Sequence, residues 1–141
     1  MKHQVTIRIR MIAPPTGVAI QVQRGREELL APVDKANGDL TFEFPIDVDI
    51  SSGTPNFLGK YAQGPKDARF IYVNSGTYGG DFNSCWNRRA KLSLTSVTKE
   101  QIETALASPH ARLETTFAGS GRDGGPTCAS VKGLVWKVVS K

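Results

Sequence analysis

The sequence has few of the residues that usually build catalytic or metal centres. It contains two histidines and two cysteines, Cys85 and Cys128, and their spacing does not match a zinc site. No apolar run approaches the ~20 residues of a transmembrane helix, and Arg8 and Arg10 interrupt the segment where a signal peptide would be apolar. We therefore expect a cytoplasmic protein with reduced thiols, no metal, no cofactor and no membrane partner.

The charge is also modest. Eighteen Lys and Arg residues against thirteen Asp and Glu give a net charge of +5 over 141 residues. Such an excess is compatible with an anionic partner, but it also keeps small domains soluble. Nucleic-acid-binding domains usually concentrate basic residues more tightly. The composition thus argues against nucleic acid as the main partner and leaves an anionic small ligand open.

Alternating apolar residues dominate the first half of the chain. Residues 4–11, 18–22 and 40–50 each alternate apolar and polar side chains, which predicts half-buried strands. The first two segments could pair as a hairpin. Pro45 has no N–H to donate, so we expect the third strand to be at an edge or bulged there. Residues 26–30 are predicted to be either a helical turn or an edge.

The second half adds four predicted strands and one helix. The strands cover residues 69–74, 88–94, 111–118 and 134–139, and the first of them is apolar enough to be covered on both faces. Thr98 with Gln101 three residues later forms a capping box for a helix over 98–108, whose apolar face should cover a sheet. The sequence predicts a single domain over residues 1–141, a β-sandwich or a partly open barrel of about seven strands.

The stretch 56–94 combines aromatic side chains, basic side chains and glycine-rich turns, which are typical parts of a binding surface. We expect its loops 57–64 and 75–88 to form a ligand site, because loops on a rigid scaffold carry binding most often. Arg88 and Arg89 alternate in side, so one of them faces inward and requires a carboxylate, a carbonyl or a bound anion. The candidate ligand-binding residues are Lys60, Tyr61, Gln63, Tyr78, Trp86, Arg88, Arg89 and Lys91.

Three further motifs suggest chemistry, and each has a simpler structural interpretation. Cys85 could be a nucleophile, but no base is tied to it by the sequence. Asp47 and Asp49 could hold calcium, although pairing with Arg8 and Arg10 on a neighbouring strand explains them more simply. Residues 119–124 spell the dinucleotide fingerprint, but no helical pattern follows them, which indicates a hairpin loop.

Several segments resemble a family of small uncharacterised bacterial proteins, a domain of unknown function. The similar segments are Phe57-Leu58-Gly59-Lys60-Tyr61-Ala62-Gln63-Gly64, Arg69-Phe70-Ile71-Tyr72, Trp86-Asn87-Arg88-Arg89-Ala90-Lys91-Leu92, a Gly-rich turn before Cys128, and Trp136 near the end. Residues 132–134 depart from the pattern, since they read Lys-Gly-Leu where the family has Arg-Pro-Pro. The resemblance implies one small bacterial domain and supplies no activity, cofactor or catalytic residue.

These observations favour a binding or interaction module for an anionic or polar small ligand over an enzyme. Two alternatives stay open. One is an enzyme that acts on a small substrate through Cys85 or a carboxylate of the site. The other is a weak single-stranded nucleic-acid binder that uses Tyr78, Trp86 and the basic strand at Arg88 to Lys91.

Overall fold

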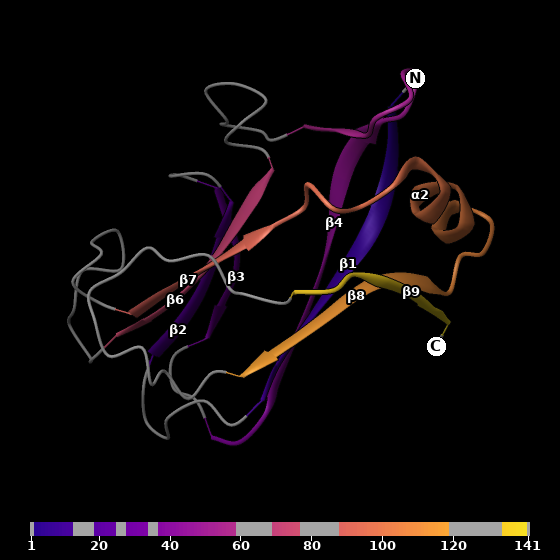
Figure 1. Ribbon diagram of the computed structural model, residues 1–141. Coiled ribbons are helices and arrows are strands. Elements are labelled where there is room, and N and C mark those ends of the chain that lie inside the picture. Colours follow the sequence, from indigo (N-terminus) through magenta and orange to yellow (C-terminus); the bar gives the residue numbers. More distant parts are fainter. Residues whose placement is uncertain are drawn as a thin grey trace.

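The chain folds into two β-sheets and one short helix (Figure 1). A computed structural model describes residues 2–12, 19–24, 28–33, 37–58, 69–76, 88–118 and 134–140. The five-stranded sheet has the order β5-β4-β1-β8-β9, with bounds β1 Lys2–Ile12, β4 Leu40–Asp49, β5 Asn56–Leu58, β8 Ala111–Ala118 and β9 Lys137–Ser140. The four-stranded sheet has the order β3-β2-β6-β7, with bounds β2 Ala19–Arg24, β3 Glu28–Val33, β6 Phe70–Gly76 and β7 Arg88–Ser93.

Both sheets are open in the described part of the chain, which therefore contains two sheets rather than a closed barrel. Neighbouring strands are antiparallel, except that β1 and β8 run parallel. A parallel pair needs a long connection, and here the four-stranded sheet and the helix lie between β1 and β8 in the sequence. The expected mainly β architecture is confirmed. Nine strands are described rather than about seven, because two short strands, β3 and β5, add to those predicted.

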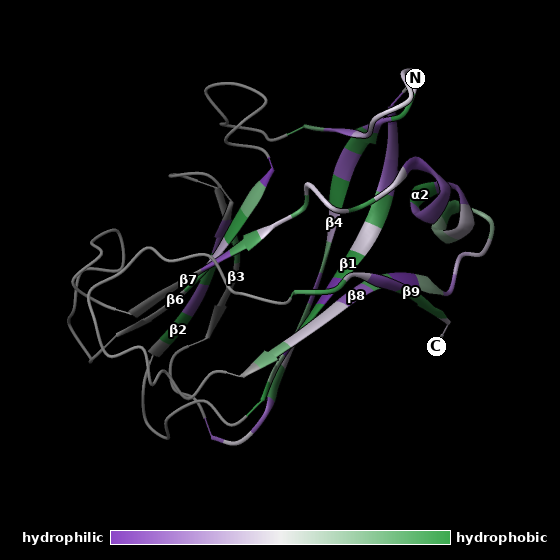
Figure 2. Cartoon of the chain, viewed as in Figure 1, coloured by the Kyte–Doolittle hydropathy of each residue, from purple (hydrophilic) through white to green (hydrophobic). Residues whose placement is uncertain are grey.

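The alternating pattern places one face of each sheet in a shared core. In β1 the odd-numbered residues Val5, Ile7, Ile9 and Met11 are buried, and the register sets Ile7 beside Phe44 of β4. The same alternation of apolar and polar residues is visible along β1 and β4 in Figure 2. The four-stranded sheet contributes buried residues of β2, β6 and β7: Ile20, Val22, Ile71, Val73 and Leu92. The core thus lies between the two sheets.

The predicted helix is present as α2, Lys99–Leu106. Thr98 accepts a hydrogen bond from the Gln101 amide at 3.1 Å, and the Gln101 side chain accepts one from the Thr98 amide at 2.9 Å. This capping box satisfies two amides that the helix itself cannot pair. The helix packs against β1, β8 and β9, with Ile102 and Ala105 buried. It covers the sheet as expected.

Some details of strand pairing differ from the prediction. The first two strands do not form a hairpin: β1 and β2 belong to different sheets, and β2 pairs instead with β3 and β6. The alternation of apolar and polar residues identifies a strand but does not indicate which strand it pairs with, and this is why the predicted hairpin is wrong. Residues 28–33 form the edge strand β3, so of the two alternatives predicted for residues 26–30 the edge is present. The last strand begins only at Lys137.

Pro45 lies in an internal strand, at a position where one side of that strand is not paired. It pairs with Thr6 of β1, whereas β5 pairs only with Asp47 to Asp49 on the other side of β4. No described strand therefore faces Pro45 on that side, and the missing N–H leaves no gap in a described ladder. β4 is therefore not the edge strand that we expected, although Pro45 itself has a described strand on one side of it and none on the other. At the preceding turn Gly38 has φ of 91°, which glycine adopts without strain.

Candidate functional site

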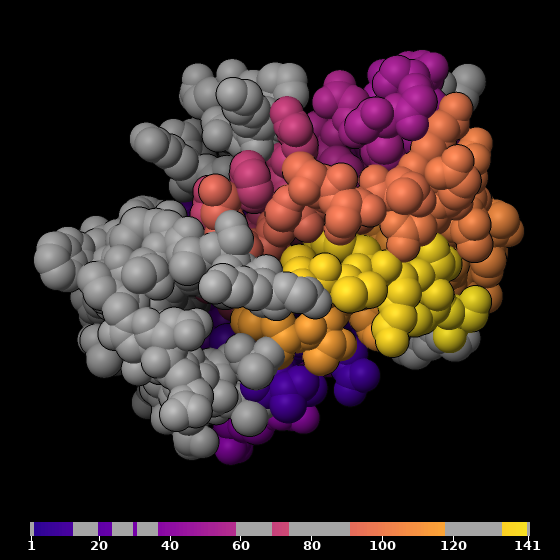
Figure 3. Space-filling view, in the orientation of Figure 1, coloured from indigo at the N-terminus to yellow at the C-terminus, as the bar shows by residue number. Residues whose placement is uncertain are grey.

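A cavity of about 300 Å³ opens at one end of the sandwich, between the two sheets. Phe57 of β5 borders it from the five-stranded sheet, and Arg69, just before β6, borders it from the four-stranded sheet. In the space-filling view, residues 51–58 and the start of β6 lie next to each other at the top of the molecule, with residues 94–97 beneath them (Figure 3). The described lining comprises Ser52, Thr54, Pro55, Asn56, Phe57, Arg69, Leu94, Thr95 and Val97.

The floor of the cavity is the outer edge of the buried core and exposes almost none of its apolar side chains to a ligand. Phe57, Leu94 and Val97 are at most 4% exposed and belong to the core between the sheets. Backbone hydrogen bonds hold this segment in place: the Leu94 amide donates to the Arg69 carbonyl at 2.8 Å, and the Val97 amide donates to the Leu94 carbonyl at 3.1 Å. The indole N–H of Trp136 donates to the Ser93 carbonyl at 2.8 Å. The floor is therefore a fixed part of the fold.

The mouth of the cavity carries polar side chains at exposed positions, namely Ser52, Thr54, Asn56 and Thr95. The Ser52 hydroxyl donates to the Thr54 carbonyl at 2.9 Å, and the hydroxyls of Ser93 and Thr95 share a hydrogen bond of 2.7 Å. The Thr95 amide also donates to the Ser93 hydroxyl at 3.1 Å. These local bonds fix where the hydroxyls lie, and each oxygen retains capacity for another hydrogen bond.

Arg69 is the charged residue in the described lining. It is half-buried, and it already makes a contact of its own within the protein. A guanidinium carries five N–H donors and keeps its charge at every physiological pH, so one contact does not exhaust it. The cavity therefore places a permanent cation beside the polar side chains of its mouth.

Most of the ligand-binding residues predicted from the sequence lie outside the described residues. These are Lys60, Tyr61, Gln63, Tyr78 and Trp86, and Cys85 and Cys128 also lie there. Residues 59–68 join Leu58 to Arg69, and the lining residues Phe57 and Arg69 stand at the two ends of this segment. The predicted loop 57–64 thus begins at the cavity. Participation of its side chains in a site stays a prediction.

For Arg88 and Arg89 the backbone is described and the side chains are not. Both belong to β7, where Arg88 pairs with Ser75 and Arg89 with Asn74 of β6. Which of the two arginines faces the core, and what it binds there, therefore stays a prediction.

Lys91 is the predicted site residue whose side chain is described. Its ammonium lies 4.0 Å from the centroid of the Phe70 ring, a cation–π contact that fixes the lysine on the half-buried face of β6 and β7. The register pairs Phe70 with Ser93, whose hydroxyl bonds Thr95 at the cavity mouth. Lys91 pairs with Tyr72, two positions along the ladder from the Phe70–Ser93 pair, and it is not among the residues that line the cavity.

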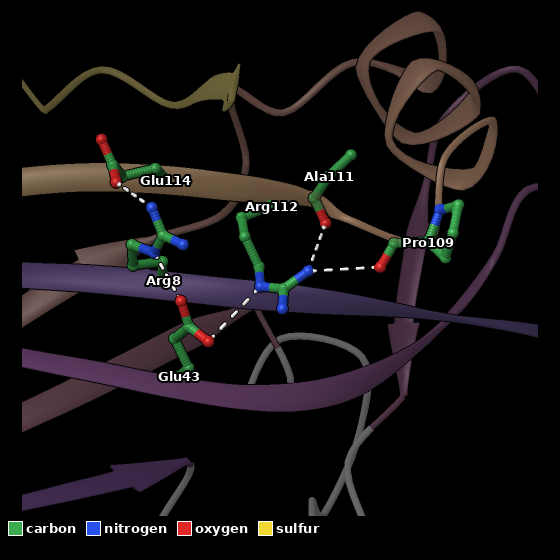
Figure 4. Close-up of polar contacts among 6 residues, drawn as sticks. All are labelled: Arg8, Glu43, Pro109, Ala111, Arg112 and Glu114. Atoms are coloured by element: carbon green, nitrogen blue, oxygen red, sulfur yellow. Dashed lines mark hydrogen bonds and ion pairs between the residues drawn. The ribbon is translucent and has the colours of Figure 1, made fainter. Parts of the chain in front are cut away.

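The acidic strand β4 forms ion pairs on the outer face of the five-stranded sheet, which is the face opposite the core (Figure 4). Arg8 lies between two carboxylates, with Nε 2.6 Å from Glu43 and Nη1 3.1 Å from Glu114. The register places these three residues side by side on β4, β1 and β8. Arg112 contacts Glu43 at 3.4 Å and donates to the carbonyls of Pro109 and Ala111. The hydrogen bond from Arg8 lowers the pKa of Glu43 and raises the pKa of Arg8.

The predicted pairing of the acidic strand with Arg8 and Arg10 is present for Glu43 with Arg8, whereas Asp47 and Asp49 have other partners. Asp47 lies 3.7 Å from the Lys2 ammonium, and Asp49 accepts hydrogen bonds from the Ser51 hydroxyl and amide, which lower its pKa to about 2. Within the described ranges, no three His, Cys, Asp or Glu residues are grouped to hold a metal ion. No helix in the described part of the chain is long and apolar enough to cross a membrane.

Comparison with known proteins identifies the family. Residues 5–139 match the family of unknown function DUF5990, a match that runs from β1 to β9. The chain belongs to this family. Comparisons with the curated proteins and with the solved structures give no match. In this DUF5990 domain, the match spans both sheets and every residue of the cavity lining, so the cavity lies within the matched residues rather than in an added segment.

Sequence reasoning missed most of the cavity residues. Ser52, Thr54 and Pro55 lie between the predicted strand 40–50 and the stretch 56–94 and were given no role, and Arg69 was predicted only as the start of an apolar strand. The signal that could have found Arg69 is its position five residues after the predicted binding loop 57–64, directly before an apolar strand. Residues where a loop meets a strand at the end of a rigid scaffold are a frequent location of ligand sites.

Proposed function

We propose that this DUF5990 domain is a non-enzymatic binding module that holds a small anionic or polar ligand in the cavity between the two sheets. The observation that carries the proposal is the cavity itself, about 300 Å³ in volume with Arg69 as its charged residue. That volume is at the lower end of the range of small-molecule sites, so the ligand is small.

The electrostatics of the two described surfaces support an anion at the cavity. On the outer face of the five-stranded sheet, Glu43 and Glu114 are matched by Arg8 and Arg112. The described lining of the cavity contains a cation and, in that described part, no carboxylate. Together with the net charge of +5, this arrangement favours an anion over a cation at the site.

The lining groups suit binding rather than catalysis. They are hydroxyls, a carboxamide, a guanidinium and apolar side chains. The hydroxyls of Ser52 and Thr95 are hydrogen-bonded to a carbonyl and to another hydroxyl, neither of which is a general base that would activate them as nucleophiles. These groups orient a ligand by hydrogen bonds. Both ends of the segment that contains Lys60, Tyr61 and Gln63 border the same cavity, which supports the predicted loop as a part of the site.

Removal of the cation tests the proposal. Titration of ¹⁵N-labelled protein with phosphate, acetate and hexanoate, followed through the amide signals of Thr54, Asn56 and Thr95, should show saturable binding of at least one of them. Arg69→Gln should weaken that binding about tenfold or more, since a hydrogen bond to a charged group contributes roughly 1.5–3 kcal/mol. The matched control is Arg10→Gln, which removes one positive charge from an exposed position of β1 and should leave binding unchanged.

Two results would overturn the proposal. One is the absence of any saturable response at the cavity amides with the anions and with neutral polar probes such as hexanamide and glycerol. The other is equal weakening by Arg69→Gln and Arg10→Gln, which would mean that only net charge matters. Arg69→Lys keeps the charge, and it provides a folded comparison if Arg69→Gln proves unstable.

A further inference from the structure

We infer that the β7 edge, which is the side of Arg88–Ser93 that faces away from β6, is a docking site for an extended acidic segment of a partner protein. The segment joins the four-stranded sheet as an additional antiparallel strand beside β7. The described lining of the cavity contains no residue of β7, so this docking site goes beyond the proposed function and is independent of the cavity ligand.

Among the border strands of the two described sheets, β7 offers the longest edge without a proline. The five-stranded sheet is bordered by β5, with three residues, and by β9, with four residues. The four-stranded sheet is bordered by β3 and β7, and β3 contains Pro32, which has no N–H to donate. β7 has six residues, pairs with β6 on one side and has no described strand on the other. An added strand therefore finds the most ladder positions at the β7 edge.

The hydrogen bonds at the end of β7 show which backbone groups reach this edge. The Leu94 amide donates to the Arg69 carbonyl at 2.8 Å, and these two residues continue the register in which Ser93 pairs with Phe70. Along an antiparallel ladder, hydrogen-bonded pairs alternate with pairs whose backbone groups point away from the partner strand. The N–H and C=O of Ser93 therefore point away from β6. The Ser93 carbonyl accordingly accepts the hydrogen bond of the Trp136 indole.

The same alternation extends to Lys91 and Arg89, which precede Ser93 at every second position of β7. Their backbone N–H and C=O groups point away from β6 as well, because their partners in the register are also alternate residues of β6. No described strand pairs with these groups at the β7 edge. They provide the donors and acceptors that an added strand requires.

The charge of β7 selects an acidic partner. The strand reads Arg-Arg-Ala-Lys-Leu-Ser, which contains three cationic residues and no carboxylate, and β6 contains no charged residue. The Lys91 ammonium lies on the Phe70 ring, and none of the ion pairs among the described residues includes it. Positive charges at an edge disfavour an apolar strand or a second copy of β7. A strand with carboxylates opposite these charges gains cross-strand attraction.

The pleat of β7 gives the spacing of those carboxylates. Leu92 is 0% exposed and belongs to the core, so Lys91 projects from the opposite face of the four-stranded sheet. In an added strand, the residue directly opposite Lys91 projects from that same face, and its own N–H and C=O point towards β7. We therefore expect Asp or Glu at every second position of the partner segment, in the residues that also make the ladder hydrogen bonds.

Peptides with selective backbone methylation test the docking site. The capped peptide Glu-Val-Glu-Val-Glu is titrated into ¹⁵N-labelled protein, and it should shift the Lys91 and Ser93 amide signals saturably while those of Thr54 and Asn56 at the cavity stay unchanged. N-methylation of the glutamates removes the ladder donors and should weaken binding about tenfold or more. N-methylation of the valines keeps the charge and places methyl groups away from β7, so it should preserve binding. Lys-Val-Lys-Val-Lys should not bind.

Charge reversal in the protein provides the second measurement. Lys91→Glu should weaken binding of Glu-Val-Glu-Val-Glu about fivefold, since it replaces a cross-strand attraction with a repulsion. The matched control is Lys137→Glu, the same exchange at an exposed position of the border strand β9, which should leave binding unchanged. Lys91→Gln removes the charge alone, and it should also weaken binding if Lys91→Glu proves unstable.

Three results would overturn the docking site. One is the absence of a saturable response of the Lys91 and Ser93 amides to Glu-Val-Glu-Val-Glu. Another is that methylation of the glutamates weakens binding no more than methylation of the valines, which would mean that charge alone attracts the peptide. The third is that oligothymidylate binds the same amides at least as tightly as the acidic peptide, which would identify a nucleic-acid surface instead. None of these results bears on ligand binding at the cavity.

Discussion

Replacement of Arg8 by methionine should destabilise the protein more than any other single change on the outer face of the five-stranded sheet. Arg8 is the residue that joins Glu43 on β4 to Glu114 on β8. The two carboxylates differ in exposure: the Glu43 side chain is 34% exposed, whereas the Glu114 side chain is 9% exposed. Loss of Arg8 therefore leaves Glu43 partly exposed and still in contact with Arg112, whereas Glu114 is left mostly buried.

The size of the effect follows from that difference. Removal of one partner of a buried ion pair costs about 3–5 kcal/mol, because it leaves a charge without compensation in a poorly solvated position. The Arg8 side chain is itself 15% exposed, so the lower end of this range applies. We therefore expect Arg8→Met to lower the free energy of unfolding by about 3 kcal/mol. The control Glu43→Gln breaks the exposed side of the network and should cost about 1 kcal/mol or less.

Urea denaturation followed by circular dichroism at neutral pH measures both values. The double variant Arg8→Met/Glu114→Met should recover most of the loss, because it removes the stranded carboxylate together with its partner and replaces both with apolar side chains. The reasoning would be refuted if Arg8→Met cost no more than Glu43→Gln. It would equally be refuted if the double variant were less stable than Arg8→Met alone.

Three further predictions concern the helix cap, the segment beneath the cavity and the response to acid. Thr98→Ala should lower the free energy of unfolding by about 1 kcal/mol through loss of the capping bond, measured in urea; an unchanged midpoint would contradict it. Trp136→Phe should cost about 1 kcal/mol and shift the Thr95 amide signal, since it removes the donor to the Ser93 carbonyl; an unmoved signal would contradict it. The pKa of Asp49 is about 2 when folded, below its unfolded value of about 3.9, so its contribution to stability is present above that value and is lost as pH falls towards 2. Unfolding measured between about pH 5 and pH 2 should therefore show a smaller acid loss in Asp49→Asn than in the wild type, and equal losses would count against it.

The sequence predicted the elements of this fold better than their arrangement. Alternation located β1, β2 and β4, and the capping box located α2 to within a residue or two. The pairing of β2 with β6 was not predictable, because it depends on which apolar faces meet after the chain collapses. The same holds for β5, since three residues that complete an edge carry too little pattern to be recognised.

The candidate site was predicted less well, because a cavity belongs to the assembly of the sheets rather than to any segment. Phe57, Arg69 and Thr95 come from three separate regions of the chain and meet only where the two sheets open. The sequence argument preferred the aromatic and basic side chains between Tyr78 and Lys91, and of these the Lys91 side chain is described, bound to Phe70 outside the cavity. The predicted loop 57–64 begins at Phe57, which lines the cavity, and its role in a site stays a prediction.

The most direct test of the proposed function is to fill the cavity from its mouth. Thr54 is exposed and lines the cavity, so Thr54→Trp should place an indole in the space where the ligand binds. Thr41→Trp makes the same exchange at an exposed position of β4 on the outer face and serves as the matched control. Titration of both variants and the wild type with whichever of phosphate, acetate and hexanoate binds the wild type should show binding lost, by about tenfold or more, in Thr54→Trp alone. Unchanged affinity in a folded Thr54→Trp protein would contradict the assignment of this cavity as the binding site.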